Sequence, residues 1–295
     1  MPVVSAARYG KDNVRVYKVH KDEATGIHTV TEMTVRCLLE GEIETSYTVA
    51  DNSVVVATDS IKNTIYIKAK EHPVNPPELY ASYLGQHFLD TYSHIHVANV
   101  DIVVKRWTRM IIDGKEHPHS FYRDGEETRN VEARITRKGI EIKSSIAGLL
   151  VLKSTGSAFH GFVRDEFTTL PETWDRILST DVDATWKWNT LPNVAAVEKK
   201  AADFDKAWED ARKITMKTFA EEDSPSVQGT MYKMAEQILD AAPEVASVTY
   251  ALPNKHYFEV DLSWHKGIKN TGKDAEVYAP QTNPNGLIKV EVSRS

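Results

Sequence analysis

Apolar and polar residues alternate along the first part of the chain with a period of two, which is typical of half-buried strands. This alternation predicts a strand over residues 14–19 and a second over 28–39, joined by turn-forming residues at 22–26. Together the two strands form a predicted hairpin. Further runs of β-type residues predict strands at 44–50, 52–58 and 95–112.

Helical spacing interrupts this β-rich region twice. Ile61 and Ile65 lie four residues apart and predict a helix whose cap lies within Thr58–Ser60. A second predicted helix begins at Pro76–Glu78. Its apolar stripe consists of Leu79, Tyr83, Leu84, His87, Phe88 and Tyr92.

The second half of the chain repeats this order of elements. Its predicted strands lie at 135–153, 157–168, 245–250 and 257–264, and its predicted helices at 173–178, 204–219 and 227–239. Strands grouped as hairpins, with helices between the groups, favour an α+β fold with antiparallel sheets over a parallel βαβ sheet. The sequence therefore predicts two similar α+β units.

Composition narrows the class of protein. The chain has 295 residues, 36 basic and 42 acidic, and a net charge of -6, which argues against a general nucleic-acid binder. Cys37 is the only cysteine, so an intrachain disulfide and a cysteine-based metal site are excluded and a reducing compartment fits best. No run approaches the roughly 20 apolar residues of a membrane helix, and the N-terminus lacks the apolar core of a secretory signal.

Several motifs of common enzyme classes are absent from the sequence. It has no glycine-rich G-x-G-x-x-G or G-x-x-x-x-G-K loop, so a nucleotide or dinucleotide phosphate site of the usual type is not expected. It also has no G-x-S-x-G nucleophile turn and no H-E-x-x-H zinc helix.

Two histidine pairs offer a candidate metal site. His94 and His96, and likewise His117 and His119, would face the same way on a strand and could chelate a metal ion. Pro118 interrupts the second pair, and the first lies at a helix-to-strand junction. We therefore favour structural roles for all four histidines and expect no metal site.

Three aspartates lie close together in the sequence. Asp175, Asp181 and Asp183 could provide the paired acids of a glycoside hydrolase. Aspartate beside serine and threonine more often forms turns and caps, so we favour that interpretation.

The segment Leu252–Phe258 combines polar and aromatic residues at the predicted mouth of a strand. Asn254 and His256 share one face if the chain is extended. A histidine moves protons near neutral pH, and an asparagine amide holds a small polar ligand without titrating. From this local pattern alone, a binding site and an ordinary hairpin both remain open.

Six segments resemble, in order, motifs of the urate oxidase (uricase) family. They are Tyr9–Val16, Val56–Thr64, Phe159–Asp165, Trp174–Ile177, Ser226–Gln228 and Leu252–Glu259. The resemblance covers nearly the whole chain and is strongest to the fungal enzymes.

This resemblance implies a fold and a reaction. The fold is two tandem tunnelling-fold (T-fold) units, here residues 1–136 and 137–295, each an antiparallel sheet with helices on one face. Four chains form a homotetramer around a tunnel, with active sites at subunit interfaces. The family oxidises urate with O2 and water to 5-hydroxyisourate and H2O2, the first step of urate degradation to allantoin, and uses neither a metal nor an organic cofactor. The resemblance also implies a peroxisomal location, although the C-terminus VEVSRS lacks the Ser-Lys-Leu address.

The resemblance assigns substrate-binding residues. Arg176 and Gln228 match the clamp on the edge of urate, and Phe159 matches the ring on which the purine stacks. The backbone N–H of Val227 would also bind the substrate. The backbone N–H of Asp59 would reach the substrate from the neighbouring chain.

It also assigns catalytic residues. Lys11, Thr58 and His256 match the triad that relays protons, and Thr58 also touches the substrate. Asn254 and Thr58 match the pair that holds O2 or the attacking water above the purine. Lys11, Thr58 and Asp59 would come from one subunit and the Arg176 group from another.

The alternative is another T-fold enzyme that acts on a purine or pterin, such as a cyclohydrolase-like hydrolase. Those enzymes bind their heterocycle through an anchoring acid, whereas the Arg176 and Gln228 pair favours an anionic oxidised purine. The solitary Cys37 also disfavours a metal-dependent cyclohydrolase. A non-catalytic homologue is disfavoured because the relay residues are intact.

Overall fold

Nine strands form one continuous sheet in the computed structural model, which describes residues 2–281 and 283–294. All neighbouring strands in it pair antiparallel, in the order β1-β2-β3-β6-β7-β8-β9-β10, and β11 also pairs with β9. The strands are β1 (Tyr9–Lys21), β2 (His28–Gly41), β3 (Ile95–Lys105), β6 (Thr128–Thr136), β7 (Gly139–Lys153), β8 (Leu178–Trp188), β9 (Val245–Glu259), β10 (Tyr278–Gln281) and β11 (Leu287–Ser293).

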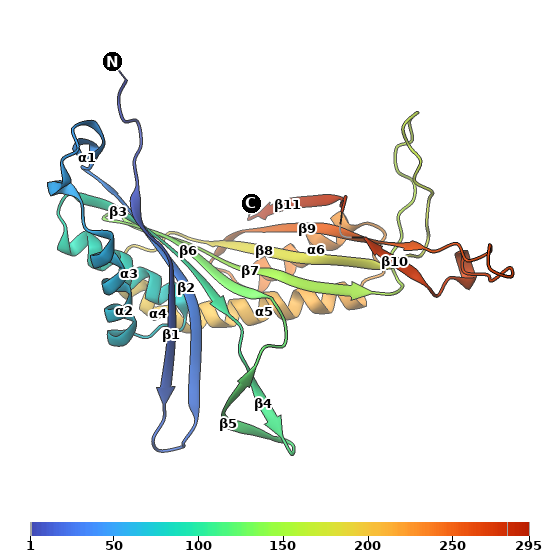
Figure 1. Cartoon of the computed structure of the whole chain (residues 1–295), viewed down its shortest axis with the longest axis horizontal. Helices are drawn as coiled ribbons and strands as arrows, with labels where there is room; N and C mark the ends of the chain where they lie inside the picture. The colour runs from blue at the N-terminus through green and yellow to red at the C-terminus, as the bar shows by residue number, and fades with distance from the viewer. Residues whose placement is uncertain (1, 282, 295) are drawn as a thin grey trace.

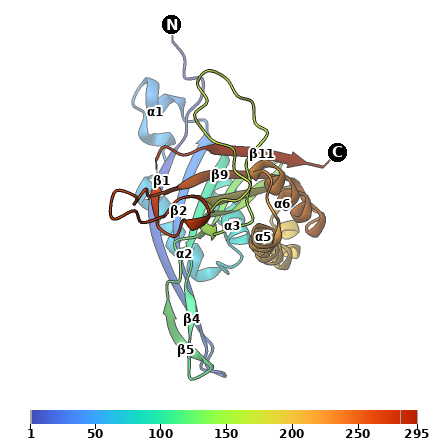
Figure 2. The same ribbon diagram turned by 90° about the vertical axis from the view of Figure 1, so that its right-hand side faces the viewer.

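Helices cover one face of this sheet (Figures 1 and 2). They are α2 (Thr58–Glu71), α3 (Pro77–Thr91), α4 (Val194–Lys199), α5 (Ala201–Glu221) and α6 (Val227–Ala241). A short helix α1 (Glu44–Thr48), two 3-10 turns (Asn52–Val54 and Gly272–Asp274) and a separate hairpin of β4 (Thr108–Ile112) and β5 (Lys115–Tyr122) complete the fold. None of the helices in the described ranges is long and apolar enough to cross a lipid bilayer.

The core lies between the sheet and the helices. On β2, every second side chain from Thr31 to Leu39 is buried, which places one face of the strand against the helices. Ile61 and Ile65 of α2 and Phe88 of α3 are fully buried in the same core. Burial of these apolar stripes holds the helices on the sheet.

The main outline of the sequence prediction is confirmed. The structure is α+β with an antiparallel sheet, and the hairpin at 14–19 and 28–39 forms β1 and β2. The helices predicted after residue 58, at Pro76–Glu78, at 204–219 and at 227–239 form α2, α3, α5 and α6.

Two predicted strands in the first half are wrong. Residues 44–50 contain the exposed helix α1, whose Ser46 and Thr48 hydroxyls donate to backbone carbonyls 2.7 and 3.0 Å away. Residues 52–58 form a 3-10 turn, at which the Asp51 carboxylate accepts the Ser53 N–H, and then the start of α2. Their β-type residues have no neighbouring strand to pair with, so local hydrogen bonds decide the conformation.

The segment between β7 and β8 is also different from the prediction. The predicted strand at 157–168 and helix at 173–178 are instead an irregular excursion, residues 154–177, which projects from the sheet in Figure 1. Its apolar residues mimic a strand pattern, but several of them are exposed, with Val163 at 92% and Phe167 at 81%. The strand follows later, as β8, which the sequence prediction missed.

Other element boundaries differ from the prediction. The predicted strand at 95–112 breaks into β3 and β4, the one at 135–153 is divided between β6 and β7, and the one at 257–264 ends with β9 at Glu259. The sequence prediction also missed β5, most of β6, β10, β11 and α4.

The two halves of the chain share one sheet. Thr136 at the end of β6 pairs with Gly139 at the start of β7, so the sheet continues across the predicted boundary between residues 136 and 137. The fully buried Glu78 of α3 also accepts from Arg129 on β6 (2.8 Å) and from the Ser144 hydroxyl on β7 (2.6 Å). The boundary itself stays a prediction.

Candidate active site

A cavity of about 560 Å³ lies where the excursion 154–177 meets the end of β9. Four of the predicted site residues line it: Phe159, Arg176, Asn254 and His256. The first two come from the excursion and the last two from β9, so residues far apart in the sequence meet here because β8 pairs with β9.

Arg176 is a half-buried cation in the wall of this cavity. Its backbone N–H donates to the Ser157 carbonyl at 2.8 Å, and its Nε lies 3.5 Å from the Ser157 hydroxyl. Within the described residues, no carboxylate lies within 4 Å of its guanidinium. Burial lowers the pKa of the Arg176 guanidinium. A partly desolvated guanidinium without a counter-charge is suited to bind an anion through two parallel hydrogen bonds.

Phe159 lies next to this guanidinium. The carbon of the Arg176 guanidinium is 5.2 Å from the centre of the Phe159 ring. Phe159 and Thr173 exchange backbone hydrogen bonds of 2.8 and 3.0 Å, and the Phe162 ring stacks on Phe159 at 4.8 Å. These contacts give a cavity wall with an aromatic face beside a cation, which suits a flat anionic heterocycle.

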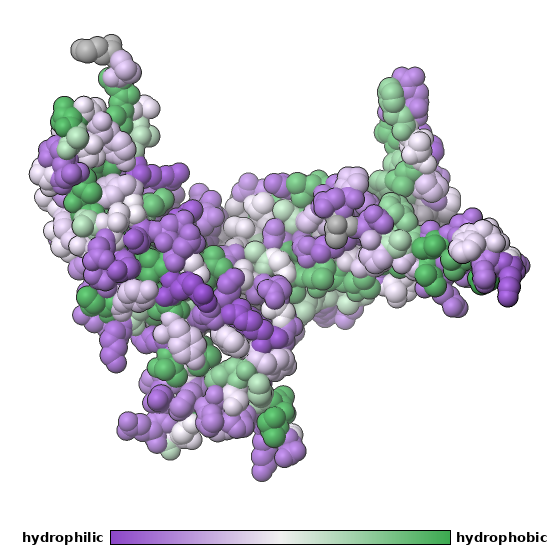
Figure 3. Space-filling view, in the orientation of Figure 1, coloured by the Kyte–Doolittle hydropathy of each residue, from purple (hydrophilic) through white to green (hydrophobic). Residues whose placement is uncertain are grey.

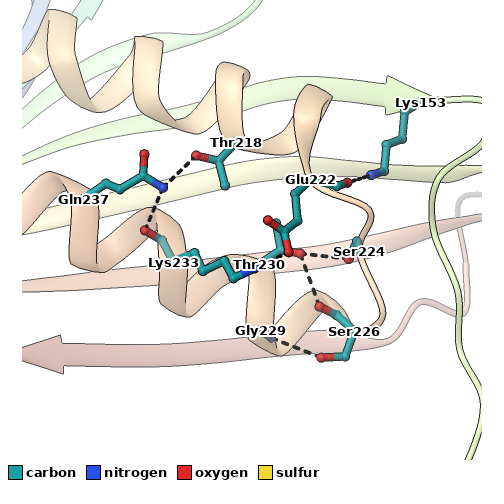
Figure 4. A network of polar contacts seen from close by, with 9 residues as sticks. All are labelled: Lys153, Thr218, Glu222, Ser224, Ser226, Gly229, Thr230, Lys233 and Gln237. Atoms are coloured by element: carbon teal, nitrogen blue, oxygen red, sulfur yellow. Dashed lines mark hydrogen bonds and ion pairs between the residues drawn. The ribbon is translucent and has the colours of Figure 1, made fainter.

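The N-terminus of α6 carries Val227 and Gln228. Ser226 caps the helix by accepting the Gly229 N–H at 3.1 Å, and Thr230 donates to the Ser224 hydroxyl at 2.8 Å (Figure 4). The N–H groups of the first helical residues have no partner within the helix and lie at its positive end. The Val227 side chain is buried in the core, whereas Gln228 is exposed.

The turn before α6 is fixed to the rest of the site. Ala158 donates to the Ser224 carbonyl at 2.8 Å, and Ser224 donates to the Gly156 carbonyl at 3.0 Å. Lys153, at the end of β7, donates to the Glu222 carbonyl, and burial lowers the pKa of its ammonium group (Figure 4). The excursion and the start of α6 are therefore held side by side.

Asn254 and His256 extend the cavity along β9. They lie two residues apart on one strand, as the sequence predicts, and both line the cavity. The Asn254 backbone N–H donates to the Gly286 carbonyl at 2.8 Å, but its side-chain oxygen is buried and has no partner among the described residues. The ring of His256 stacks on Phe258 at 5.9 Å.

Lys11, Thr58 and Asp59 form a second group away from this cavity. Lys11 lies on β1, and Thr58 and Asp59 are the first two residues of α2. The Asp59 carboxylate pairs with Lys62 at 2.6 Å, and its pKa is lowered mainly by Lys62 and further by the charge of Lys11. The Tyr9 hydroxyl accepts the Val56 N–H at 2.7 Å and so fixes β1 beside the entry to α2.

The two groups occupy opposite ends of the sheet (Figure 1). β1 and β9 are separated by six strand spacings in the strand order, about 29 Å along the sheet at ~4.8 Å a spacing. Lys11 and His256 of one chain therefore do not share a site. The grouping that the resemblance implies, with Lys11, Thr58 and Asp59 on one subunit and Arg176 on another, matches this separation.

The cavity has further lining residues that sequence reasoning missed. Tyr257 and Lys255 lie inside the Leu252–Phe258 motif but were not singled out, and Lys273 and Tyr278 lie in a region with no recognised motif. Lys255 pairs with Asp181 on β8 at 2.8 Å. For Lys255 and Tyr257, their place within a polar strand end was the available signal.

The histidine pairs have structural partners. His94 lies 3.0 Å from the Val54 carbonyl, and His96 lies 3.1 Å from Glu42. The His119 N–H donates to His117 at 3.4 Å. Within residues 2–281 and 283–294, no group of three or more His, Cys, Asp or Glu side chains could hold a metal ion.

The three aspartates serve turns and pairs. Asp183 accepts the Gly148 N–H at 2.9 Å, where Gly148 has a positive φ of 70° at a bulge in β7. Asp181 pairs with Lys255, and Asp175 accepts from Thr155 and Gly156. The contacts of Asp175 and Asp183 agree with the turn interpretation, whereas Asp181 forms an ion pair instead.

A model of the uricase family matches residues 7–134 and 142–289. The chain belongs to the uricase family. Uricases from Emericella nidulans and Aspergillus flavus are each 68% identical to it, over 100% of this chain and 98% of theirs. The uricase of Arabidopsis thaliana is 38% identical, over 97% of this chain and 94% of its own. The stronger resemblance to fungal members is thereby confirmed.

Solved structures of uricases share the fold. The uricase of Arthrobacter globiformis superposes with a TM-score of 0.88 at 36% identity, covering 100% of this chain and 96% of that chain. The urate oxidase of Bacillus sp. TB-90 gives 0.83 at 26% identity, covering 98% and 100%. These likenesses confirm the uricase fold of tandem T-fold units that the sequence resemblance implies.

Proposed function

We propose that this protein is a urate oxidase, which converts urate, O2 and water to 5-hydroxyisourate and H2O2. The observation that carries the proposal is the uncompensated Arg176 cation beside the Phe159 ring, in a cavity that also contains Asn254 and His256. Membership of the uricase family supports the same substrate. Nothing in the comparisons favours a cyclohydrolase-like hydrolase.

Substrate binding follows from the shape and charge of urate. The flat purine stacks on Phe159, and its anionic edge accepts two hydrogen bonds from the Arg176 guanidinium. Gln228 offers both a donor and an acceptor to the adjacent edge. The free N–H groups at the start of α6, including that of Val227, add donors where the helix dipole favours negative charge.

Catalysis requires a proton relay and a place for O2. Two electrons leave urate and reduce O2 to H2O2, while water adds its oxygen to the purine to give 5-hydroxyisourate, so that atoms and electrons balance. Lys11 and Thr58 remove a proton from urate, and His256 continues the relay. Asn254 and Thr58 hold O2, and later water, above the purine plane, where the fixed geometry lowers the barrier.

The site is completed by a second chain in a homotetramer. Three observations support this part of the proposal: the separation of the Lys11 group from the Arg176 group, the open edge of β1, and the exposed Val163 and Phe167 on the excursion, which carries apolar patches in Figure 3. Open edges and apolar patches favour association with another chain. Asp59 of that second chain would offer its backbone N–H to urate.

The decisive experiment measures urate loss and O2 uptake together, under air and under argon. We expect equal loss of urate and O2, H2O2 as the product, and unchanged rates after EDTA treatment. No turnover under air would overturn the proposal, and turnover only with added metal would refute its cofactor-free form.

Because H2O2 is released, we also propose a peroxisomal location, which fluorescence microscopy of the tagged protein would test.

A further inference from the structure

Asp175 lies next to Arg176 in the sequence, yet its carboxylate is bonded elsewhere. One oxygen accepts the Thr155 hydroxyl at 2.7 Å, and the other accepts the Gly156 backbone N–H at 2.9 Å. No ion pair joins Asp175 to any cation among the described residues. Both acceptor oxygens therefore bind the irregular segment that follows β7, and not the neighbouring guanidinium.

These two bonds close the base of the excursion 154–177. Residues 155 and 156 are where the chain leaves β7, and residue 175 is where it returns. Gly156 has a positive φ of 76°, so the chain turns sharply at this point. The Asp175 carboxylate fixes the outgoing chain to the returning chain at that turn.

The two bonds from the Asp175 carboxylate to Thr155 and Gly156, here called the Asp175 clamp, lie between the two parts of the proposed substrate site. On one side of it, Ser157 accepts the Arg176 N–H at 2.8 Å, which sets the position of the guanidinium. On the other side, Gly156 and Ala158 bond to Ser224, in the turn that precedes α6. The segment 156–158 thus connects Arg176 to the start of α6, and Asp175 holds that segment.

We propose that Asp175 is a positioning residue that keeps Arg176 and Phe159 aligned with the N-terminus of α6. This inference rests on the proposed function, because it concerns the site for urate. Asp175 acts through hydrogen-bond geometry, since its two oxygens accept from a hydroxyl and an N–H; burial lowers the pKa of the nearby Lys153, and the charge of Asp175 also acts to raise that pKa. Its loss lets the excursion move and weakens the binding of urate, while the chemistry of bound urate changes less.

The first test compares Asp175→Ala with Asp175→Asn. Asparagine accepts the Gly156 N–H through its oxygen and donates to the Thr155 hydroxyl, which can rotate. We expect KM for urate to rise about tenfold or more in Asp175→Ala, with a smaller change in kcat, and to stay within about twofold of the original in Asp175→Asn. An Asp175→Ala KM within twofold of the original would overturn the proposal.

If Asp175 instead acted through its charge on urate, its replacement would change KM in the opposite direction. If the carboxylate acted by repelling anionic urate in the cavity, both substitutions would lower KM. A lower KM in both variants, or equal impairment of both, would therefore overturn the geometric role. If Asp175→Ala does not fold, Thr155→Val removes one of the two donors, and an unchanged KM in that variant also overturns the proposal.

Asp165 provides a matched control in the same excursion. Its carboxylate also accepts one threonine hydroxyl, from Thr168 at 2.9 Å, and one backbone N–H, from Phe167 at 3.0 Å. These bonds close only a local turn at the tip, and Asp165 does not line the cavity. Because this turn contains Phe167, gel filtration first checks that Asp165→Ala assembles like the original protein; with unchanged assembly, we expect KM and kcat to be unchanged.

Hydrogen exchange distinguishes failure of this inference from failure of the proposed function. In Asp175→Ala, amides of residues 156–159 should exchange about tenfold faster, and in Asp165→Ala they should not. If the unaltered protein does not oxidise urate, the proposed function fails, whereas faster exchange would still show the clamp. Unchanged exchange in Asp175→Ala would overturn the clamp whatever the activity.

Discussion

Arg176 is the site residue whose surroundings are best suited to bind an anionic ligand. It is half-buried, its pKa is lowered by burial, and no carboxylate in the described residues neutralises it. Protein cations in that state are normally paired, because desolvating an unpaired charge costs free energy. This is the feature on which the proposed binding of anionic urate depends.

Replacing Arg176 by lysine tests the planar fork separately from the charge. Lysine keeps the charge but loses the two parallel hydrogen bonds, worth about 1.5–3 kcal/mol for a charged pair, so KM for urate should rise about 10- to 100-fold. Initial rates over a range of urate concentrations measure this rise. Arg134→Lys, on β6 and outside the cavity, is the control and should leave KM unchanged. A KM within threefold of the original in Arg176→Lys would contradict the assignment.

Variants of Lys11 and Thr58 should lower turnover much more than they weaken the binding of urate. If they relay a proton, Lys11→Met and Thr58→Ala should lower kcat about 10²- to 10⁴-fold, the range of general acid–base catalysis. Equilibrium binding of urate under argon, where no turnover occurs, should change much less. Lys21→Met, at the other end of β1, is the matched control and should retain full turnover. Unchanged kcat in both variants would refute the relay.

At the scale of elements, the sequence predicted those with a complete period and a buried face. The hairpin of β1 and β2 and the helices α2, α3 and α6 have clear alternation or stripes, and each buries that face in the core. Residues 44–50 and 157–168 have β-type composition but no partner strand, a fact that depends on the whole topology. Local pattern cannot show which segments meet, so these predictions were wrong.

The candidate site was predictable for a different reason. Phe159, Arg176, Asn254 and His256 were recognised by family motifs, and the structure brings these four together. The local pattern alone left Asn254 and His256 undecided between a site and a hairpin. Lys273 and Tyr278 follow no motif, and only the fold of the chain around β10 places them in the cavity wall.

The cap of α6 gives a prediction at this scale. Ser226→Ala removes the acceptor for the Gly229 N–H and should lower the free energy of unfolding by about 1 kcal/mol. It should also raise KM for urate a few-fold, because the helix start that carries Val227 and Gln228 would fray. Asn193→Ala, which uncaps α4, should cost similar stability and leave KM unchanged. Urea denaturation and urate kinetics measure both effects, and equal KM changes in the two variants would contradict the role of α6.

At the scale of the whole molecule, the residues of the proposed active site lie in two groups, one near β1 and one at the end of β9. The sheet separates β1 from β9 by five intervening strands, so no bend of a single loop brings Lys11 to His256. Buried contacts such as Glu78 with Arg129 and Ser144 hold the two halves as one body. The proposed second copy of the chain, with its β1 end at this cavity, would bring the two groups together without distorting either end.

Mixing two inactive variants tests this arrangement directly. Lys11→Met inactivates one end and Arg176→Ala the other, so each protein alone should have little activity. Unfolded together in equal amounts and refolded, they should regain about a quarter of the original activity, because each site draws both intact ends with a probability of about one half each. The same mixture assembled from separately refolded proteins should stay inactive until subunits exchange. If each site used both groups from one chain, the two variants could not complement each other. A refolded mixture as inactive as its components would therefore exclude a site shared between chains.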